Sequence, residues 1–387
     1  MSAAPIISWT EAGEARTARW RSEGGAPPPR KVVVAEDNSM TADAAYRLAC
    51  EGTALLWRGD FQNARQLLQA MARRADAKPR KKQKPPTSLG EAFNQHRLAQ
   101  SQRARVLASL LIPVEADYSI ALRRAPDMHE AIAEGWGPMD EGGEASVASL
   151  RELLGLTGAH EWRKKGVEIA ALGGRIHPHY GVFSPVRGEY ITLVAAAPLP
   201  EMLLTRGADK PAFDIGTGTG VLAALLAHRG VARVVATDQD ARAIACALEN
   251  IARLGLADHV EVVQTDMFPP GRAQLIVCNP PWVPARPSSP LEHAIFDPDS
   301  RMLRAFLSGL AAHLEPGGEG WLILSDLAEH LGLRTREALL GMIAAAGLQV
   351  LGKSDMKPHH PRASDASDPL HAARKAELTS LWRLGAA

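Results

Sequence analysis

Cysteine is scarce in this sequence, and long apolar runs are absent from it. The chain holds three cysteines, Cys50, Cys246 and Cys278, which are far apart and form no Cys-x-x-Cys pair. This excludes a disulfide framework and a thiolate metal site, and it fits a reducing compartment. No apolar stretch approaches the roughly 18 residues that a membrane span needs, so the sequence predicts no transmembrane helix.

A secretory signal and an excess of charge of one sign are also missing. The N-terminus, MSAAPIISWTEAGEARTARWRSEGG, has no apolar core of the kind that signal peptides carry, so we expect a cytoplasmic protein. Lys and Arg number 44 against 43 Asp and Glu, which gives a net charge of +1. Attraction to nucleic acid by overall charge is thereby excluded, whereas a local basic surface is not.

The length and composition are those of an ordinary globular protein. The 387 residues are 46% hydrophobic and 22% charged, which is enough for two or three domains with sizeable cores. Residues 1–30, ending in GGAPPPR, predict a flexible leader. Residues 31–137 predict a mainly helical, basic domain. For residues 138–181 we expect a linker and a short hairpin that turns at Gly173-Gly174.

From about Pro211 the pattern changes to strands that alternate with helices. The segments PAFDIG, ARVVATD, HVEVVQTD and AQLIVCNPP are typical of strands, and GVLAALLAHRG and DARAIACALENIARLGL are typical of helices. Such alternation predicts an α/β fold with a doubly wound, mainly parallel sheet.

A glycine-rich turn joins the first of these strands to its helix. Gly216, Gly218 and Gly220 lie in FDIGTGTGV, and Asp214 precedes them. Glycine lets the backbone approach a ligand closely, and a helix N-terminus favours polar or anionic groups. The spacing is GxGxG rather than the GxGxxG of dinucleotide sites. A carboxylate beside a pyrophosphate is also unfavourable, so a nicotinamide-dependent oxidoreductase is the weaker alternative.

Three further polar residues follow the next strands: Asp238 in VVATD, Asp266 in VVQTDMF and Asn279 in IVCNPPW. Ligands of doubly wound sheets bind beyond the carboxyl ends of the strands. Four consecutive strands that each bring an acid or an amide to that edge therefore predict a binding site.

This series resembles the motifs of class I S-adenosylmethionine-dependent methyltransferases over about Val182 to Leu384. NPPW is similar to the NPPY/NPPF signature of enzymes that methylate planar nitrogens. These include adenine-N6 and guanine-N2 methyltransferases of nucleic acid and the release-factor glutamine (HemK-like) methyltransferases. The resemblance implies a seven-stranded sheet, a methyltransferase domain at residues 182–387 and S-adenosylmethionine as the cofactor. The tryptophan departs from the commoner Tyr or Phe.

By that resemblance, Asp214 and the glycine turn would hold the methionine moiety, and Asp238 would accept the ribose hydroxyls. Asp266 would take the adenine amino group, with Met267 and Phe268 beside the ring. The implied cofactor-binding residues are Asp214, Gly216, Thr217, Gly218, Gly220, Asp238, Asp266, Met267 and Asn279. The implied catalytic residues are Asn279, Pro280, Pro281 and Trp282.

The chemistry of a planar nitrogen explains the four residues of NPPW. Its lone pair is delocalised into the π-system, so attack requires that the nitrogen be held in line. The side-chain oxygen of Asn279 and the carbonyl of Pro280 are acceptors for its two N–H groups. The prolines stiffen the loop, and Trp282 offers a face for stacking.

The nature of the acceptor depends on the N-terminal half. Residues 58–105 contain twelve Lys and Arg against three Asp and Glu, which predicts salt-dependent phosphate affinity, or a solvated basic loop. We therefore expect an RNA substrate, ribosomal RNA in particular, ahead of a protein glutamine. A nucleic-acid-binding protein without turnover is a further alternative. No metal is predicted, because His359, His360 and His371 lack regular ligand spacing. The candidate substrate residues are Arg80, Lys81, Lys82, Lys84 and Arg187.

Overall fold

The computed structural model describes residues 5–37, 39–77, 85–139, 143–204, 210–287, 292, 294–358 and 368–387. The chain divides into two compact units. Unit 1 comprises Met1–Pro85 and Asn94–Glu161, and unit 2 comprises Pro86–Phe93 and Trp162–Ala387. Within the described ranges, no helix is long and apolar enough to cross a bilayer.

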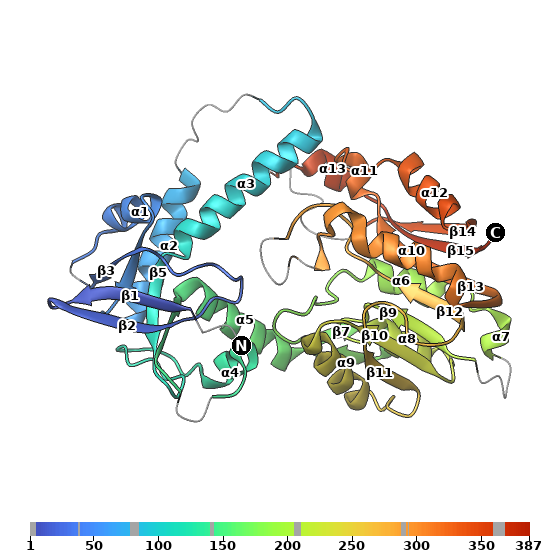
Figure 1. The fold of residues 1–387 in the computed structure, drawn as a ribbon, viewed down its shortest axis with the longest axis horizontal. Coiled ribbons are helices and arrows are strands. Elements are labelled where there is room, and N and C mark those ends of the chain that lie inside the picture. The colour runs from blue at the N-terminus through green and yellow to red at the C-terminus, as the bar shows by residue number, and fades with distance from the viewer. Residues whose placement is uncertain are drawn as a thin grey trace. The chain divides into compact units, whose positions relative to one another are not determined.

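Unit 1 is built around a six-stranded sheet with the order β1-β2-β6-β5-β4-β3 (Figure 1). Its strands are β1 (Ile6–Glu11), β2 (Glu14–Trp20), β3 (Lys31–Ala35), β4 (Thr53–Trp57), β5 (Leu110–Val114) and β6 (Ser146–Ser149). Its helices are α1 (Ala42–Cys50), α2 (Phe61–Ala77), α3 (Leu89–Leu107), α4 (His129–Trp136) and α5 (Leu150–Lys165), of which α3 begins and α5 ends in unit 2.

The flexible leader predicted for residues 1–30 is wrong, because strands β1 and β2 form an antiparallel hairpin there. Its two-residue turn is Ala12-Gly13, with φ of 52° and 83°, as tight hairpin turns require. Ile7 and Trp20 are buried. Apolar and polar residues alternate over residues 7–10 of strand β1. That alternation was the signal of a strand, and the many charged residues around it obscured it.

The region predicted to be mainly helical, residues 31–137, does contain helices α1, α2, α3 and α4, but the parallel strands β3, β4 and β5 that run through it were not predicted. Their sequences are KVVVA, TALLW and LLIPV. Strands buried on both faces form continuous apolar runs that periodicity cannot distinguish from a buried helix. The predicted linker fails for β6, which pairs with both β5 and β2.

Unit 2 contains the predicted hairpin and the predicted seven-stranded sheet. The hairpin joins β7 (Val167–Ile169) to β8 (Gly174–Ile176) through the 3-10 turn η1 (Ala170–Leu172), and Gly173 has a φ of 57°. Unit 2 therefore starts before the predicted boundary at residue 182. The sheet strands are β9 (Ala212–Ile215), β10 (Val234–Asp238), β11 (Val260–Gln264), β12 (Ala273–Cys278), β13 (Leu314–Ser325), β14 (Leu348–Met356) and β15 (Thr379–Ala386).

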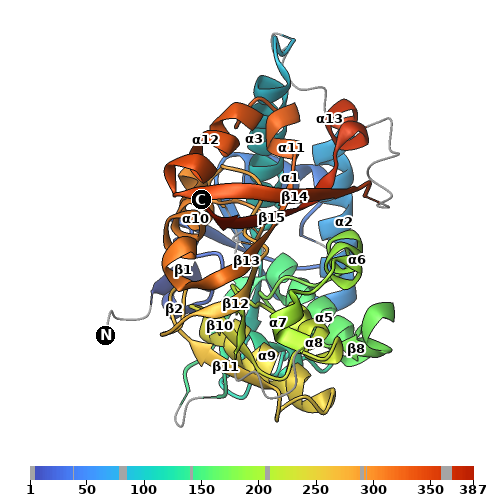
Figure 2. The same cartoon turned by 90° about the vertical axis from the view of Figure 1, so that its right-hand side faces the viewer.

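The sheet order is β11-β10-β9-β12-β13-β15-β14, and only β15 is antiparallel to its neighbours. Figure 2 shows β13, β15 and β14 at one end of this sheet. The helices are α6 (Glu189–Ala196), α7 (Glu201–Leu204), α8 (Val221–His228), α9 (Ala241–Arg253), α10 (Arg301–His313), α11 (Leu327–His330), α12 (Arg336–Ala345) and α13 (His371–Ala376), with a 3-10 turn η3 (Pro298–Ser300).

Two hydrophobic cores cover the two faces of this sheet. Along β12, Leu275 and Val277 belong to the core that contains α6 and α8, whereas Ile276 and Cys278 belong to the core that contains α10 and α12. Side chains of a strand alternate between the faces, so helices on both sides bury the whole strand. The doubly wound prediction is confirmed, and the carboxyl ends of the strands are held rigidly.

Candidate active site

The central strands bring the predicted residues to one edge of the sheet. Ile215 of β9 is aligned with Thr237 of β10 and with Cys278 of β12, in parallel register. The next residues along the chain, Gly216, Asp238 and Asn279, therefore emerge side by side. This edge is where doubly wound sheets bind ligands.

The side chain of Asp214 anchors the glycine turn through hydrogen bonds. The side chain is buried, with 1% exposed, and its Oδ2 accepts from the Thr217 hydroxyl at 2.7 Å and from the Ala223 amide at 3.0 Å. Burial raises the pKa of Asp214 to about 6, because a desolvated carboxylate loses its hydration. A negative charge placed there favours a cation nearby.

The glycine turn itself presents bare backbone. Gly216 and Gly218 are partly exposed, with φ of 72° and 56°, a region that side chains other than glycine rarely adopt. The amides of Gly216 and Thr217 both donate to the carbonyl of Thr237. A Cβ added at Gly220 would stand 3.3 Å from Ala247 of α9, so this third glycine permits close helix packing.

Asp238 is partly committed to holding the turn. Its Oδ2 accepts from the Gly218 amide and its Oδ1 from the Asp240 amide, both at 3.0 Å. Burial raises the pKa of Asp238 above its ordinary value. A carboxylate has about four acceptor positions, so each oxygen retains capacity for a hydroxyl donor.

The residues after β11 divide between surface and core. Asp266 is exposed and lies 3.7 Å from Arg301. Met267 has a φ of 68°, and its carbonyl accepts from the Thr237 hydroxyl at 2.7 Å. Phe268 stacks on His313, with ring centroids 4.3 Å apart. The ring of Phe268 thus packs against the core that contains α10, and its predicted place beside a bound adenine stays a prediction.

Sequence reasoning missed Asn250, a fully buried residue of α9. Its amide donates to the carbonyl of Thr219 in the glycine turn, and its oxygen accepts from the amide of His177 just after β8. A buried polar side chain is retained when it satisfies buried backbone groups. An asparagine on the apolar face of ALENIARL was the available signal.

NPPW leaves β12 with Asn279 half-buried and Pro280 buried. The indole N–H of Trp282 donates to Oδ1 of Asn279 at 2.9 Å. The carboxamide therefore lies at the strand edge rather than in the interior. Pro281 and Trp282 are half-buried.

Arg187, a candidate substrate residue, is engaged within unit 2. Its Nε donates to Glu189 at 2.6 Å and its Nη2 to Glu377 at 3.0 Å. The guanidinium carbon lies 4.8 Å from the centroid of the Trp282 ring. Arg187 thus covers one face of the aromatic ring that was expected to stack against an acceptor.

A segment from the N-terminal half packs beside the same loop. Phe93 is buried in a cluster with Val283 and Leu331, and its ring lies 6.2 Å from that of Phe296. Phe93 lies in helix α3, and the hydroxyl oxygen of Ser88 caps the start of this helix by accepting from the amide of Glu91. Pro86–Phe93 belongs to unit 2, so unit 2 includes residues that precede the predicted domain by nearly a hundred positions.

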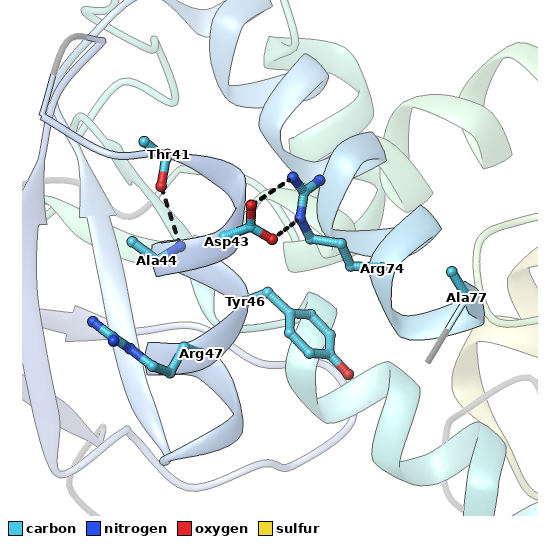
Figure 3. Close-up of a pocket in the computed structure, with 7 residues that line it drawn as sticks. All are labelled: Thr41, Asp43, Ala44, Tyr46, Arg47, Arg74 and Ala77. Atoms are coloured by element: carbon cyan, nitrogen blue, oxygen red, sulfur yellow. Dashed lines mark hydrogen bonds and ion pairs between the residues drawn. The ribbon is translucent and has the colours of Figure 1, made fainter. Parts of the chain in front are cut away.

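The basic surface is partly neutralised within unit 1. Arg58 pairs with Glu11, Arg74 with Asp43, and Arg103 with Asp76. Figure 3 shows the Asp43–Arg74 pair at the rim of a hollow of about 590 Å³. The hollow is lined by Thr41, Asp43, Ala44, Tyr46, Arg47, Arg74 and Ala77. The candidates Arg80, Lys81, Lys82 and Lys84 lie outside the described residues, as do His359 and His360. The part of the chain that is described has no group of three metal-ligating side chains.

Three relatives share part of the sequence. The release factor glutamine methyltransferase of Cereibacter sphaeroides is 38% identical over 150 residues, 35% of this chain and 51% of its own length. The ribosomal protein L11 methyltransferase of Sorangium cellulosum is 28% identical, over 52% of this chain and 63% of its own. The tRNA1(Val) (adenine(37)-N6)-methyltransferase of Bacteroides thetaiotaomicron is 32% identical, over 38% of this chain and 64% of its own.

The chain thus spans between half and two thirds of these relatives. Residues 173–338 match the family described as "Methyltransferase small domain". The match contains the glycine turn, Asp238, Asp266 and NPPW. Residues 173–338 of unit 2 therefore match a methyltransferase small domain, and this part of the chain is similar to class I S-adenosylmethionine-dependent methyltransferases.

Proposed function

We propose that this protein is an S-adenosylmethionine-dependent N-methyltransferase that acts on a planar nitrogen, namely an exocyclic base amine of RNA. The observation that carries the proposal is the alignment of Cys278 with Ile215. It puts the Asn279 carboxamide next to the glycine turn, at the edge of one rigid sheet. A group held by the turn and a nitrogen held by Asn279 would then be neighbours.

The residues at this edge fit S-adenosylmethionine by their chemistry. Gly218 has open space where a Cβ would stand, so its backbone can be approached closely. The carboxylates of Asp214 and Asp238 complement a cationic amino acid and the hydroxyl donors of a ribose. When bound, the cofactor supplies a methyl group activated by a sulfonium. The residues that would hold it are Asp214, Gly216, Thr217, Gly218, Gly220, Asp238, Asp266, Met267 and Asn279.

The protein's task is then to hold the acceptor nitrogen. Oδ1 of Asn279 and the carbonyl of Pro280 accept from its two N–H groups, which aims the lone pair and stabilises the charge that develops. The Pro280-Pro281 pair keeps both acceptors still. A strong base is not required, because the nitrogen loses its proton readily once it is alkylated.

An RNA acceptor is supported by the excess of Lys and Arg in residues 58–105. Because Arg58, Arg74 and Arg103 are ion-paired, that support now falls chiefly on Lys78, Arg80, Lys81, Lys82 and Lys84, which are not among the described residues. A protein glutamine is the second candidate, because the matched release-factor enzyme is 38% identical. For either acceptor we expect the protein to act in the cytoplasm.

The test is transfer of a radiolabelled methyl group from S-adenosylmethionine into lysate from a strain that lacks the gene. We expect label in RNA that ribonuclease removes. Label that persists in protein after ribonuclease supports the glutamine acceptor instead. Failure of the purified protein to bind S-adenosylmethionine in calorimetry would refute the enzyme altogether.

The Asn279→Ala variant tests the site. We expect it to bind the cofactor normally and to lose transfer by a factor of about a hundred or more. Asn94→Ala, at an exposed position of α3, is the matched control and keeps full activity. If Asn279→Ala transfers methyl groups at the native rate, the acceptor site lies elsewhere.

A further inference from the structure

The tryptophan of NPPW makes a contact with Asn279 that Tyr or Phe cannot make. Its Nε1–H donates to Asn279 Oδ1 at 2.9 Å. A phenyl ring has no donor at all, and a phenol carries its donor at the far tip of the ring. An amide oxygen has two lone pairs, so one remains for the N–H group of an acceptor. The indole therefore fixes the direction in which the second lone pair points.

The indole ring is held in turn by Arg187. The guanidinium stacks over it at 4.8 Å, a contact in which cation–π attraction and planar stacking combine. Arg187 cannot swing away freely, because it bridges Glu189 and Glu377, which are 6% and 4% exposed. Glu377 also accepts from the Ser325 hydroxyl at 2.6 Å.

The main chain of Trp282 is fixed from another direction. Nη2 of Arg334 donates to the Trp282 carbonyl, and its Nη1 donates to the Ser300 hydroxyl, both at 3.3 Å. Arg334 is only 7% exposed. The half-buried Arg187 thus holds the ring of Trp282 and the buried Arg334 holds its backbone, so the ring orientation is set before any acceptor arrives.

We propose that Trp282 is a positioning residue for Asn279 and that Arg187 acts through it. Arg187 fixes the indole, and the indole N–H fixes the carboxamide whose free lone pair receives the acceptor nitrogen. The inference rests on the proposed function. It adds that a planar acceptor can use at most one face of the indole, since Arg187 covers the other. Arg187 therefore serves the site without contacting the substrate.

Kinetics of three variants test the order of action. Trp282→Phe keeps an aromatic ring but removes the N–H donor together with the five-membered ring, so we expect kcat to fall at least about tenfold, the worth of one orienting hydrogen bond, with the dissociation constant of S-adenosylmethionine unchanged. Arg187→Lys loses the planar group, and we expect its kcat to fall as well. In the Trp282→Phe background, Arg187→Lys should add nothing further. Arg233→Lys, in the exposed pair with Glu261, is the control.

Native kcat in Trp282→Phe, or additive losses in the double variant, would overturn the proposal.

A second measurement does not depend on turnover. In ¹⁵N-labelled protein, the Trp282 indole N–H signal is identified by its loss in Trp282→Phe. We expect it to move upfield and to exchange at least about tenfold faster in Asn279→Ala, as a lost hydrogen bond requires. If the signal does not move, the hydrogen bond between Trp282 and Asn279 is refuted, even if methyl transfer is observed. A moved signal in a protein without transferase activity retains the contact and refutes the proposed function.

Discussion

The side-chain amide of Asn250 donates to the main-chain carbonyl of Thr219, 3.1 Å away. The oxygen of the same carboxamide accepts from the His177 amide at 2.7 Å. One buried side chain of α9 therefore ties the glycine turn to the segment that follows the β7–β8 hairpin. The shape of the turn depends on a residue that stands thirty positions later in the chain.

Replacing Asn250 by Leu should loosen the turn. The substitution keeps the number and branching of the side-chain heavy atoms and leaves the Thr219 carbonyl and the His177 amide buried without partners, at a cost of about 2–3 kcal/mol in the free energy of unfolding. We expect denaturant unfolding to show this loss and calorimetry to show weaker S-adenosylmethionine binding. Native cofactor affinity in the destabilised variant would mean that Asn250 supports stability alone.

Cofactor binding should depend on pH through Asp214. Its pKa is raised to about 6, so the carboxyl gains a proton as the pH falls through 6, and the charge that favours a cation disappears. We expect the dissociation constant of S-adenosylmethionine to rise by up to about tenfold per pH unit below 6. Calorimetry between pH 5 and 8 measures it, with proton release on binding near pH 6.

Asp214→Asn is the control for this effect. The amide oxygen can still accept from Thr217 and Ala223, which Oδ2 serves in the native protein, but the group no longer titrates. We expect weaker binding at pH 7.5 and a flat profile toward acid. A profile that still bends near pH 6 would assign the titration to another group.

Replacing Phe93 should disturb the loop that follows NPPW and leave the affinity for the cofactor unchanged. Phe93→Ala opens a cavity beside Val283 and Phe296, which costs about 3–5 kcal/mol for a buried aromatic. We expect a lower melting temperature and a higher KM for the acceptor, with unchanged cofactor affinity. Leu98→Ala, at an exposed position of the same helix, should change stability by less than about 0.5 kcal/mol. Equal losses of both affinities would contradict the assignment of Phe93 to the loop.

Asp60 should stabilise unit 1 more at neutral pH than at acid pH. Its buried carboxylate bonds to Arg123 and Arg124, and the bond with Arg124 holds the pKa of Asp60 well below its ordinary value. A depressed carboxyl pKa contributes stability that is present above the unfolded pKa and is lost as the pH falls. In Asp60→Asn we expect faster hydrogen exchange in β4 and β5 at pH 7, and a smaller difference from the native protein at pH 3.

Cofactor binding by Asp60→Asn should stay native, because Asp60 belongs to unit 1 and the predicted cofactor residues belong to unit 2. A parallel loss of cofactor binding would show that the two units depend on each other for stability. The same difference in exchange at both pH values would mean that the charge of Asp60 does not matter.

The sequence by itself determined the sheet of unit 2 and the residues at its edge. Asp214, Asp238 and Asn279 stand directly at the ends of short apolar runs, and register in a parallel sheet is local enough to bring them together. The hairpin at Gly173 followed from the same kind of local signal. Unit 1 did not, because the apolar runs of β3, β4 and β5 lack the alternation that marks a half-exposed strand.

Only the tertiary structure determined which residues pair with these side chains. Glu11 and Asp43 neutralise arginines that sequence counting left as a basic surface. Glu377, far along the chain, holds Arg187 over Trp282. Apolar periodicity records which face of an element is buried, whereas a hydrogen bond or an ion pair between distant residues leaves no periodic trace. The residues of the candidate site could therefore be predicted from the sequence, but the network that orients them could not.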